Sequence, residues 1–124
     1  MVSAVHTSSF PDGTYGGTAS GYVFGFENKN LYLAGDIGIM QDMALLSSVF
    51  GEISLAILPV GGHYTMDAMG ACFAASELIK TKKVLGCHFD TFPPITINHA
   101  EAEQYFRDKN IEFILPKLGE EFEF

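Results

Sequence analysis

Basic residues are scarce in this sequence of 124 residues, which has 7 Lys and Arg against 15 Asp and Glu. The resulting net charge of −8 argues against binding to nucleic-acid phosphates and to anionic membrane surfaces. No segment approaches the roughly 20 apolar residues that a membrane span requires. The N-terminus also lacks the basic region and the long apolar run of a signal peptide. We therefore expect a cytoplasmic protein whose partners include neither nucleic acid nor membrane.

Cysteine is also rare. Cys72 and Cys87 are the two cysteines, and their spacing is not that of a CxxC motif or a disulfide framework. Neither lies in a basic stretch that would clearly lower the pKa of its thiol. We expect two buried, unpaired thiols in a reduced compartment, with a disulfide as the less favoured alternative.

Two catalytic signatures are absent as well. The sequence has no G-x-S-x-G motif, so a serine hydrolase lacks its local signature. The glycine-rich stretch PDGTYGGTASG, residues 11–21, precedes a predicted strand rather than a helix, and it contains no G-K-[ST]. A phosphate-binding loop is therefore not favoured.

The residues that are present suit one globular α/β domain over residues 1–124. Hydrophobic residues make up 48% of the sequence and charged residues 18%, a balance that excludes a disordered chain. About the first twenty residues are rich in Gly, Ser and Thr and predict a loop with several turns. The runs GYVFGFE and LYLAGD then flank the polar turn Asn28–Asn30, which predicts a β-hairpin.

The middle of the chain alternates helix and strand patterns. Residues 39–50 have the apolar spacing of a helix, which Gly51 would end. The apolar run ISLAILPV, residues 53–60, predicts a strand covered on both faces. Thr65 is expected to cap a second helix that runs to about Lys80. The residues expected to share one face of that helix are Met69, Cys72, Phe73, Ser76 and Ile79.

The last third of the chain continues this alternation. Residues 82–89 predict a buried strand, Pro93 and Pro94 a rigid loop, and Asn98 the start of a helix. IEFILP predicts the final strand. The order strand, helix, strand, helix, strand after the hairpin implies right-handed crossovers and a largely parallel sheet.

Polar residues follow several of the predicted strands. Asp36 follows LYLAG, His63 follows ILPVGG and His88 follows KVLGC, while His6 lies near the N-terminus. In open α/β sheets, ligands collect beyond the carboxyl ends of the strands. Two His and a carboxylate suit a divalent ion such as zinc, manganese or iron. Glycines beside Asp36 and before His63 would let the backbone approach a ligand closely.

Each of these residues also has a structural interpretation. A His at a strand end is more often a hydrogen-bonded structural residue than a ligand, and Asp36 in a G-D-x-G turn is typical of a turn former. His99, at an exposed helix start, is given no function. The methionines expected to fill the core are Met40, Met43 and Met69.

Five short motifs together resemble a known family. AVHTSS, GYVF, YLAGDIG, LPVGGHYTM and CHFDTFP occur over residues 4–93 in the order found in metal-dependent hydrolases of the metallo-β-lactamase fold. The most similar group is that of the bacterial hydrolases resembling L-ascorbate 6-phosphate lactonase. The resemblance implies the C-terminal half of an αββα sandwich, built as a β-hairpin followed by βαβαβ. It also implies a lactonase-like or phosphoester-type hydrolase that acts on a small molecule.

The resemblance implies roles for five residues. His6, Asp36 and His88 match metal ligands of the family. Asp36 matches the aspartate that bridges two metals and lies beside the attacking oxygen, so it is also the expected catalytic residue. His63 and Tyr64 are expected to contact substrate. The implied cofactor is a divalent metal, in one or two copies, with zinc or manganese favoured over iron or nickel.

One motif of the family is missing. H-x-H-x-D-H, which belongs to the family's first half, does not occur in this sequence. The resemblance therefore implies a partial metal site, and we expect the chain alone to bind metal weakly and to be inactive. We also expect an exposed apolar sheet face, and hence self-association or pairing with a separately made N-terminal half. The alternatives are a non-catalytic remnant or interaction module without a complete metal site, and an unrelated α/β binding module.

Overall fold

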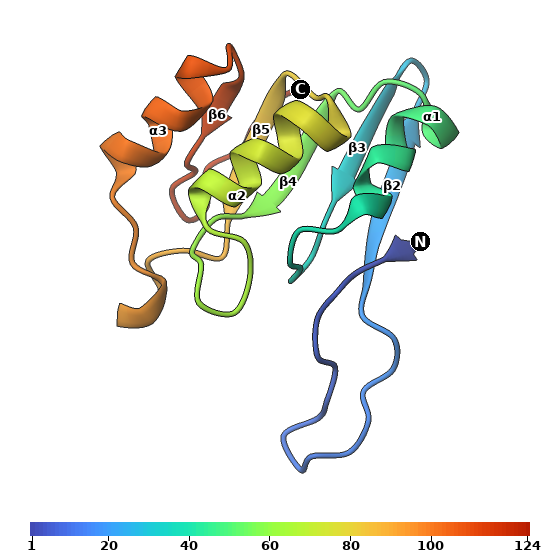
Figure 1. Cartoon of the computed structure of the whole chain (residues 1–124), viewed down its shortest axis with the longest axis vertical. Coiled ribbons are helices and arrows are strands. Elements are labelled where there is room, and N and C mark those ends of the chain that lie inside the picture. The colour runs from blue at the N-terminus through green and yellow to red at the C-terminus, as the bar shows by residue number, and fades with distance from the viewer.

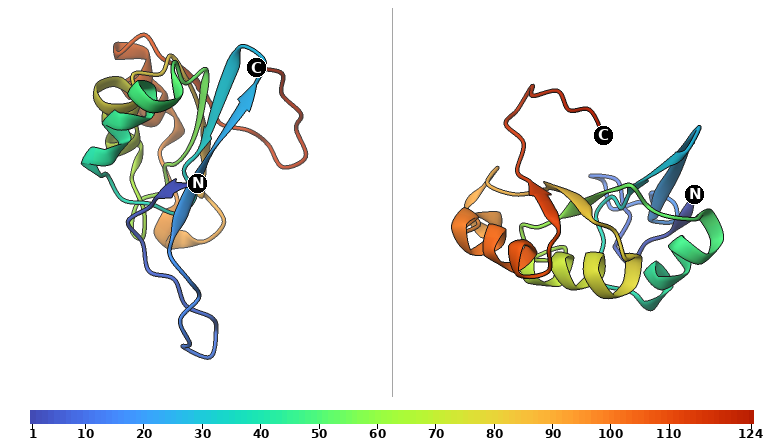
Figure 2. Two further views of the ribbon diagram at one scale, coloured as in Figure 1. Left: turned by 90° about the vertical axis from the view of Figure 1, so that its right-hand side faces the viewer. Right: turned by 90° about the horizontal axis from the view of Figure 1, so that it is seen from above.

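The structure, a computed structural model that describes all of residues 1–124, is a six-stranded sheet with helices on one face (Figures 1 and 2). In chain order the strands are β1 (Val2–Ser3), β2 (Ser20–Phe26), β3 (Lys29–Leu33), β4 (Leu55–Pro59), β5 (Lys83–Cys87) and β6 (Glu112–Ile114). The helices are η1 (Gln41–Leu45), α1 (Leu46–Phe50), α2 (Ala68–Phe73), η2 (Ala74–Ile79), η3 (Pro93–Ile95) and α3 (His99–Asp108).

The strands lie in the sheet in the same order as in the chain. The pairs β1–β2 and β2–β3 are antiparallel, whereas β3 to β6 run parallel to one another. Because this order never reverses, crossovers of one hand place every connecting helix on the same face. The right-hand view of Figure 2 shows the helices below the sheet and no helix above it. The predicted α/β class, with a hairpin followed by βαβαβ, is confirmed.

The hairpin and the N-terminus differ in detail from the prediction. Phe26 pairs with Lys29, so the turn consists of Glu27 and Asn28, and the residues after it already belong to β3. Asn30 is held in the strand because its side-chain nitrogen donates to the carbonyl oxygens of Phe50, at 2.8 Å, and Glu52, at 3.1 Å. The predicted N-terminal loop also begins with a short strand, since β1 pairs with the first residues of β2.

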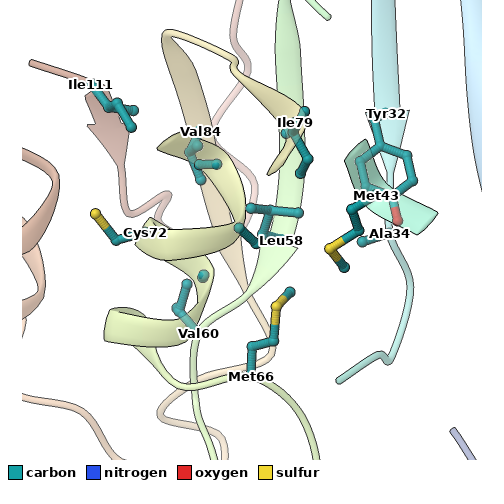
Figure 3. Close-up of a cluster of buried hydrophobic side chains, with 14 of the residues drawn as sticks. Tyr32, Ala34, Met43, Leu58, Val60, Met66, Cys72, Ile79, Val84 and Ile111 are labelled. Carbon is teal, nitrogen blue, oxygen red and sulfur yellow. The ribbon is translucent and has the colours of Figure 1, made fainter. Parts of the chain in front are cut away.

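The core lies between the sheet and the helix layer. Leu58 of β4 lies near Ile79 of η2 and Val84 of β5, and Tyr32 of β3 lies against Met43 of η1 (Figure 3). The helix surface that meets the sheet is rich in alanine, because Ala68, Ala71, Ala74 and Ala75 are all buried. Such small side chains let the helix lie close to the strands.

The second helix starts later than predicted, and a different face of the helix packs against the sheet. Asp67 rather than Thr65 is its N-cap, because the Asp67 carboxylate accepts a hydrogen bond from the Gly70 amide at 2.7 Å. The alanine surface sets the rotation of the helix. Met69 is therefore 59% exposed and does not fill the core, and Phe73 is exposed as well.

The other helix boundaries largely agree with the sequence. Gly51 ends α1 with a φ of 82°, and Lys80 ends η2 in the left-handed region. Asn98 caps α3, since its side-chain oxygen accepts from the Glu101 amide at 3.3 Å. None of the helices combines the length and the apolar character that a membrane crossing requires.

The sheet face opposite the helices is apolar and is exposed mainly at the hairpin. Val23 of β2 packs against the core, so its neighbours Tyr22 and Phe24 point to the other face, where both are exposed. The apolar residues that share this face by register are Tyr22, Phe24, Phe26, Leu31, Leu33, Leu55, Ile57, Leu85 and Ile114. The C-terminal segment runs on this side of the sheet (Figure 2), and the ring of Phe124 contacts Phe26 edge-on at 5.9 Å. We call this surface the open face.

Candidate metal centre

The predicted site residues lie around one pocket at the carboxyl ends of the parallel strands. Asp36 follows β3, His63 follows β4, and His88 follows β5. These three, together with His6 and Tyr64, line a cavity of about 580 Å³. Residues far apart in the sequence therefore meet because β3, β4 and β5 are neighbours and run in the same direction.

Asp36 and His88 are the closest pair among the predicted ligands. Nε2 of His88 lies 3.7 Å from Oδ2 of Asp36, with 24% of the His88 side chain and 52% of the Asp36 side chain exposed. The other ring nitrogen of His88, Nδ1, is buried and has no hydrogen-bond partner. A buried nitrogen without a partner is costly, and such exceptions point to a missing contact at the site.

His6 is brought to the same pocket by the N-terminal segment. The Gly38 amide donates to the carbonyl of Val5 at 3.1 Å, which holds this segment beside the loop that carries Asp36. The imidazole of His6 contacts the Thr7 carbonyl oxygen through Nδ1 at 2.8 Å. Its Nε2 has no protein partner and remains free to bind a ligand.

His63 and Tyr64 form the rim of the pocket. Their loop is compact, because the Tyr64 and Thr65 amides both donate to the Gly62 carbonyl and the Met66 amide donates to the Ile37 carbonyl. The rings of His63 and Tyr64 meet edge-on with centroids 4.2 Å apart. Tyr64 also faces Phe92 of the neighbouring loop at 6.3 Å, and both of these rings are exposed.

The turn after β5 has a strained backbone. His88 has a φ of 55° and Asp90 a φ of 58°, and neither residue is a glycine. Gly61 lies directly against this turn, since a Cβ on Gly61 would be 2.1 Å from the carbonyl oxygen of His88. The glycine predicted to allow a close approach to a ligand thus allows a close approach between two segments of backbone.

Asp90 and His99 form a pair that the sequence did not reveal. Oδ2 of Asp90 lies 2.5 Å from Nε2 of His99, and Oδ1 accepts from the Ile97 amide at 3.0 Å. These contacts with His99 and with the Ile97 amide hold the pKa of the Asp90 carboxyl below its usual value. No spacing rule links residues 90 and 99, because the loop between them is irregular.

Both cysteines are free, as predicted. Cys72 is buried and its thiol donates to the Tyr105 carbonyl at 3.2 Å. Cys87 is partly buried next to the site, where burial and then the charge of Asp36 raise the pKa of its thiol to about 11. Neither thiol is poised to react or to bind a metal at neutral pH.

The donor types of the site fit a divalent metal, but the arrangement is incomplete. Two imidazoles and a carboxylate are ligands that zinc, manganese and iron all accept. The unpartnered Nδ1 of His88 and the free Nε2 of His6 also belong to groups able to bind an ion. No group of three or more His, Cys, Asp or Glu side chains, however, lies close enough together to hold one. The predicted ligands therefore share a pocket without forming a complete set of metal donors.

The chain is similar in sequence to proteins described as UPF0173 metal-dependent hydrolases. One of them, from Flavobacterium johnsoniae, is 48% identical over 122 residues, which are 98% of this chain and 53% of that protein. The chain thus spans about half the length of the curated relatives it matches. No family model matches the sequence.

Solved structures define the class of fold. Igni18, a metallo hydrolase from the archaeon Ignicoccus hospitalis, matches 95% of this chain and 51% of its own, with a TM-score of 0.78 and 31% identity. A protein of the metallo-β-lactamase superfamily from Thermotoga maritima matches 79% of this chain and 48% of its own, with a TM-score of 0.57 and 24% identity. At 24% identity, the similarity to the Thermotoga maritima protein shows a shared fold alone. The chain therefore has the α/β fold of about half of a metallo-β-lactamase-type protein.

Proposed function

We propose that the chain is the C-terminal half of a metal-dependent hydrolase, and that its pocket becomes the active site when a second half covers the open face. The observation that carries this proposal is the meeting of His6, Asp36 and His88 at one pocket. They come from the N-terminal segment and from two strand ends. The similarity to metal-dependent hydrolases supports the same reading.

His6, Asp36 and His88 are the residues that would hold a metal. A divalent ion there would supply Lewis acidity and would lower the pKa of water toward neutrality. The half-exposed carboxylate of Asp36 can accept a hydrogen bond from the attacking water and orient it. The rim residues His63 and Tyr64 are both exposed, so their ring N–H and O–H groups can donate to the oxygens of a substrate.

The substrate class that we propose is a lactone or a phosphoester of a small molecule. Both present an electrophilic carbon or phosphorus with an oxygen that gains negative charge during attack, which the pocket's donors would stabilise. The resemblance to the L-ascorbate 6-phosphate lactonase group supports the lactone. A simple lactone and an activated phosphodiester, each tested with zinc and with manganese, would separate the two.

The open face supports the need for a second half. Exposed aromatic side chains on one sheet face, Tyr22, Phe24 and Phe26, are typical of a surface that binds another protein element. No three donor side chains of the chain lie close enough together to hold an ion, which supports a need for further ligands. We therefore propose that the second half supplies both a covering sheet and further ligands, and that the chain associates with itself in its absence.

The metal proposal is tested by equilibrium dialysis of the chain with zinc or manganese. We expect weak binding to the wild type that is lost in His88→Ala and in Asp36→Asn. Asp42→Asn, which removes an exposed carboxylate outside this pocket, should bind like the wild type. Equal binding by all four proteins would exclude this site, and tight binding of two ions would contradict a partial shell.

The half-protein proposal is tested by adding the part of the Flavobacterium johnsoniae relative that this chain does not match. We expect a complex of one copy of each, measured by light scattering, and metal-dependent hydrolysis that neither part shows alone. The second candidate function is a non-catalytic interaction module, which the lack of three converging donors favours. A stable complex without hydrolysis of any lactone or phosphoester would support that module instead.

A further inference from the structure

The loop between β5 and α3 carries His88 at its first position and ends at the start of α3. It is closed by the pair Asp90 and His99, whose Oδ2 and Nε2 atoms are 2.5 Å apart. We call this pair the clasp. It joins the residue two positions after His88 to the first residue of α3. The clasp is only partly shielded, since 35% of the Asp90 side chain and 51% of the His99 side chain are exposed.

The backbone at His88 needs such support. His88 and Asp90 both have left-handed φ values, which cost free energy in residues with a Cβ and persist only where neighbours enforce them. Asp90 makes three contacts that hold this turn in place. Its amide donates to the Ile95 carbonyl at 2.9 Å, its Oδ1 accepts from the Ile97 amide at 3.0 Å, and its Oδ2 contacts His99.

The same loop carries Phe92, which faces the rim residue Tyr64. The two ring centroids are 6.3 Å apart across the gap between the two loops. His99 is placed by a second contact, because the ring of Phe89 meets the His99 ring edge-on at 5.7 Å. One pair of side chains therefore fixes the shape of a loop that reaches the candidate metal ligand and the candidate substrate rim.

We propose that the Asp90–His99 clasp positions His88 and Phe92, so that the candidate ligand keeps its place in the pocket and the ring of Phe92 stays against Tyr64. The role of the clasp rests on the proposed function. The contacts that form it lie within this chain alone. Asp90 and His99 are positioning residues, since neither lines the pocket that His88 shares with Asp36 and His63.

The test compares His99→Ala, which removes the clasp, with His99→Gln, whose amide N–H can still donate to Asp90. Asp90→Asn, which keeps the acceptor for the Ile97 amide, is a second variant in case His99→Ala does not fold. Lys109→Ala is the matched control. It removes a different surface ion pair, the 3.0 Å contact between Lys109 at the C-terminal end of α3 and Glu77. Each is made in the full 124-residue chain.

Two readouts are measured by NMR. The first is the set of ring signals of His88 in the metal-free protein, with their contacts to Asp36. The second is the zinc affinity from a titration that follows the same signals. We expect His99→Ala to displace the His88 signals, to remove the contacts to Asp36 and to weaken zinc binding about tenfold. His99→Gln and Lys109→Ala should resemble the wild type in both readouts.

The inference is overturned if His99→Ala leaves the His88 signals and contacts unchanged. It is also overturned if Lys109→Ala changes them as much, because the effect would then be a general loosening of α3. A wild type that binds no zinc would count against the proposed function. The metal-free NMR comparison would still decide whether the clasp positions His88.

Discussion

The close approach between Gly61 and the His88 turn makes Gly61→Ala a strong test of the structure. The added Cβ would lie 2.1 Å from the His88 carbonyl oxygen and 2.9 Å from Cβ of Ile95. The two backbones must separate by about 0.9 Å to reach the shortest tolerated distance of 3.0 Å. That shift would also stretch the hydrogen bond from the Val60 amide to the Cys87 carbonyl, now 3.0 Å.

These two effects set the expected magnitude. Overpacking in a tight site costs about 1–3 kcal/mol, and a lost backbone hydrogen bond costs about 1 kcal/mol. We therefore expect Gly61→Ala to reduce the free energy of unfolding by about 3 kcal/mol. With a urea m-value of about 1.5 kcal/mol per M, the midpoint should fall by about 2 M, measured by circular dichroism.

Gly25→Ala is the matched control for this experiment. A Cβ on Gly25 would be 3.5 Å from Oδ1 of Asn30, which is an ordinary contact. Its unfolding free energy should stay within about 0.5 kcal/mol of the wild type. A Gly61→Ala midpoint within about 0.3 M of the wild type would refute the close packing of these two loops.

Three further predictions follow from the described contacts. Asp67→Ala should lower the unfolding free energy by about 1 kcal/mol through loss of the α2 cap, whereas Thr65→Ala should change it by less than about 0.5 kcal/mol in the same urea titration. The folded pKa of Asp90 lies below the unfolded value of 3.8, so its stabilising effect is present above pH 3.8 and is lost as pH falls through the folded pKa. Asp90→Asn should therefore lose less stability than the wild type on acidification in that range, and equal pH profiles would contradict the pair. Because the pKa of the Cys87 thiol is about 11, iodoacetamide should alkylate it much more slowly at pH 8.5 in the folded chain than in urea, as followed by mass spectrometry; equal rates would refute its burial.

Most of the fold was predictable because its signals are local. The apolar runs of β4, β5 and β6 gave the strands, and Gly51 and Asn98 marked the ends of helices by known rules of capping. The errors arose where a tertiary contact decided between near-equal local choices. Thr65 and Asp67 are both good caps, and the packing of the alanine surface on the sheet selected Asp67 and turned Met69 outward.

Only part of the candidate site was predictable from the sequence. The rule that ligands collect at the carboxyl ends of parallel strands correctly predicted that Asp36, His63 and His88 share a pocket. Whether three of them bind a metal is untested and stays a prediction. The Asp90–His99 pair and the contact of Phe92 with Tyr64 had no signal in the sequence, because both depend on how an irregular loop folds back.

The strand order also bears on how the polypeptide acquires its shape. Each strand from β2 onward hydrogen-bonds to the strand made just before it. Each parallel pairing must still close a stretch of about 24 to 29 residues, since Leu31 pairs with Leu55, Ala56 with Val84 and Lys83 with Glu112. No strand has to be inserted between two that are already paired, so the sheet can grow by one strand at a time as the chain is made.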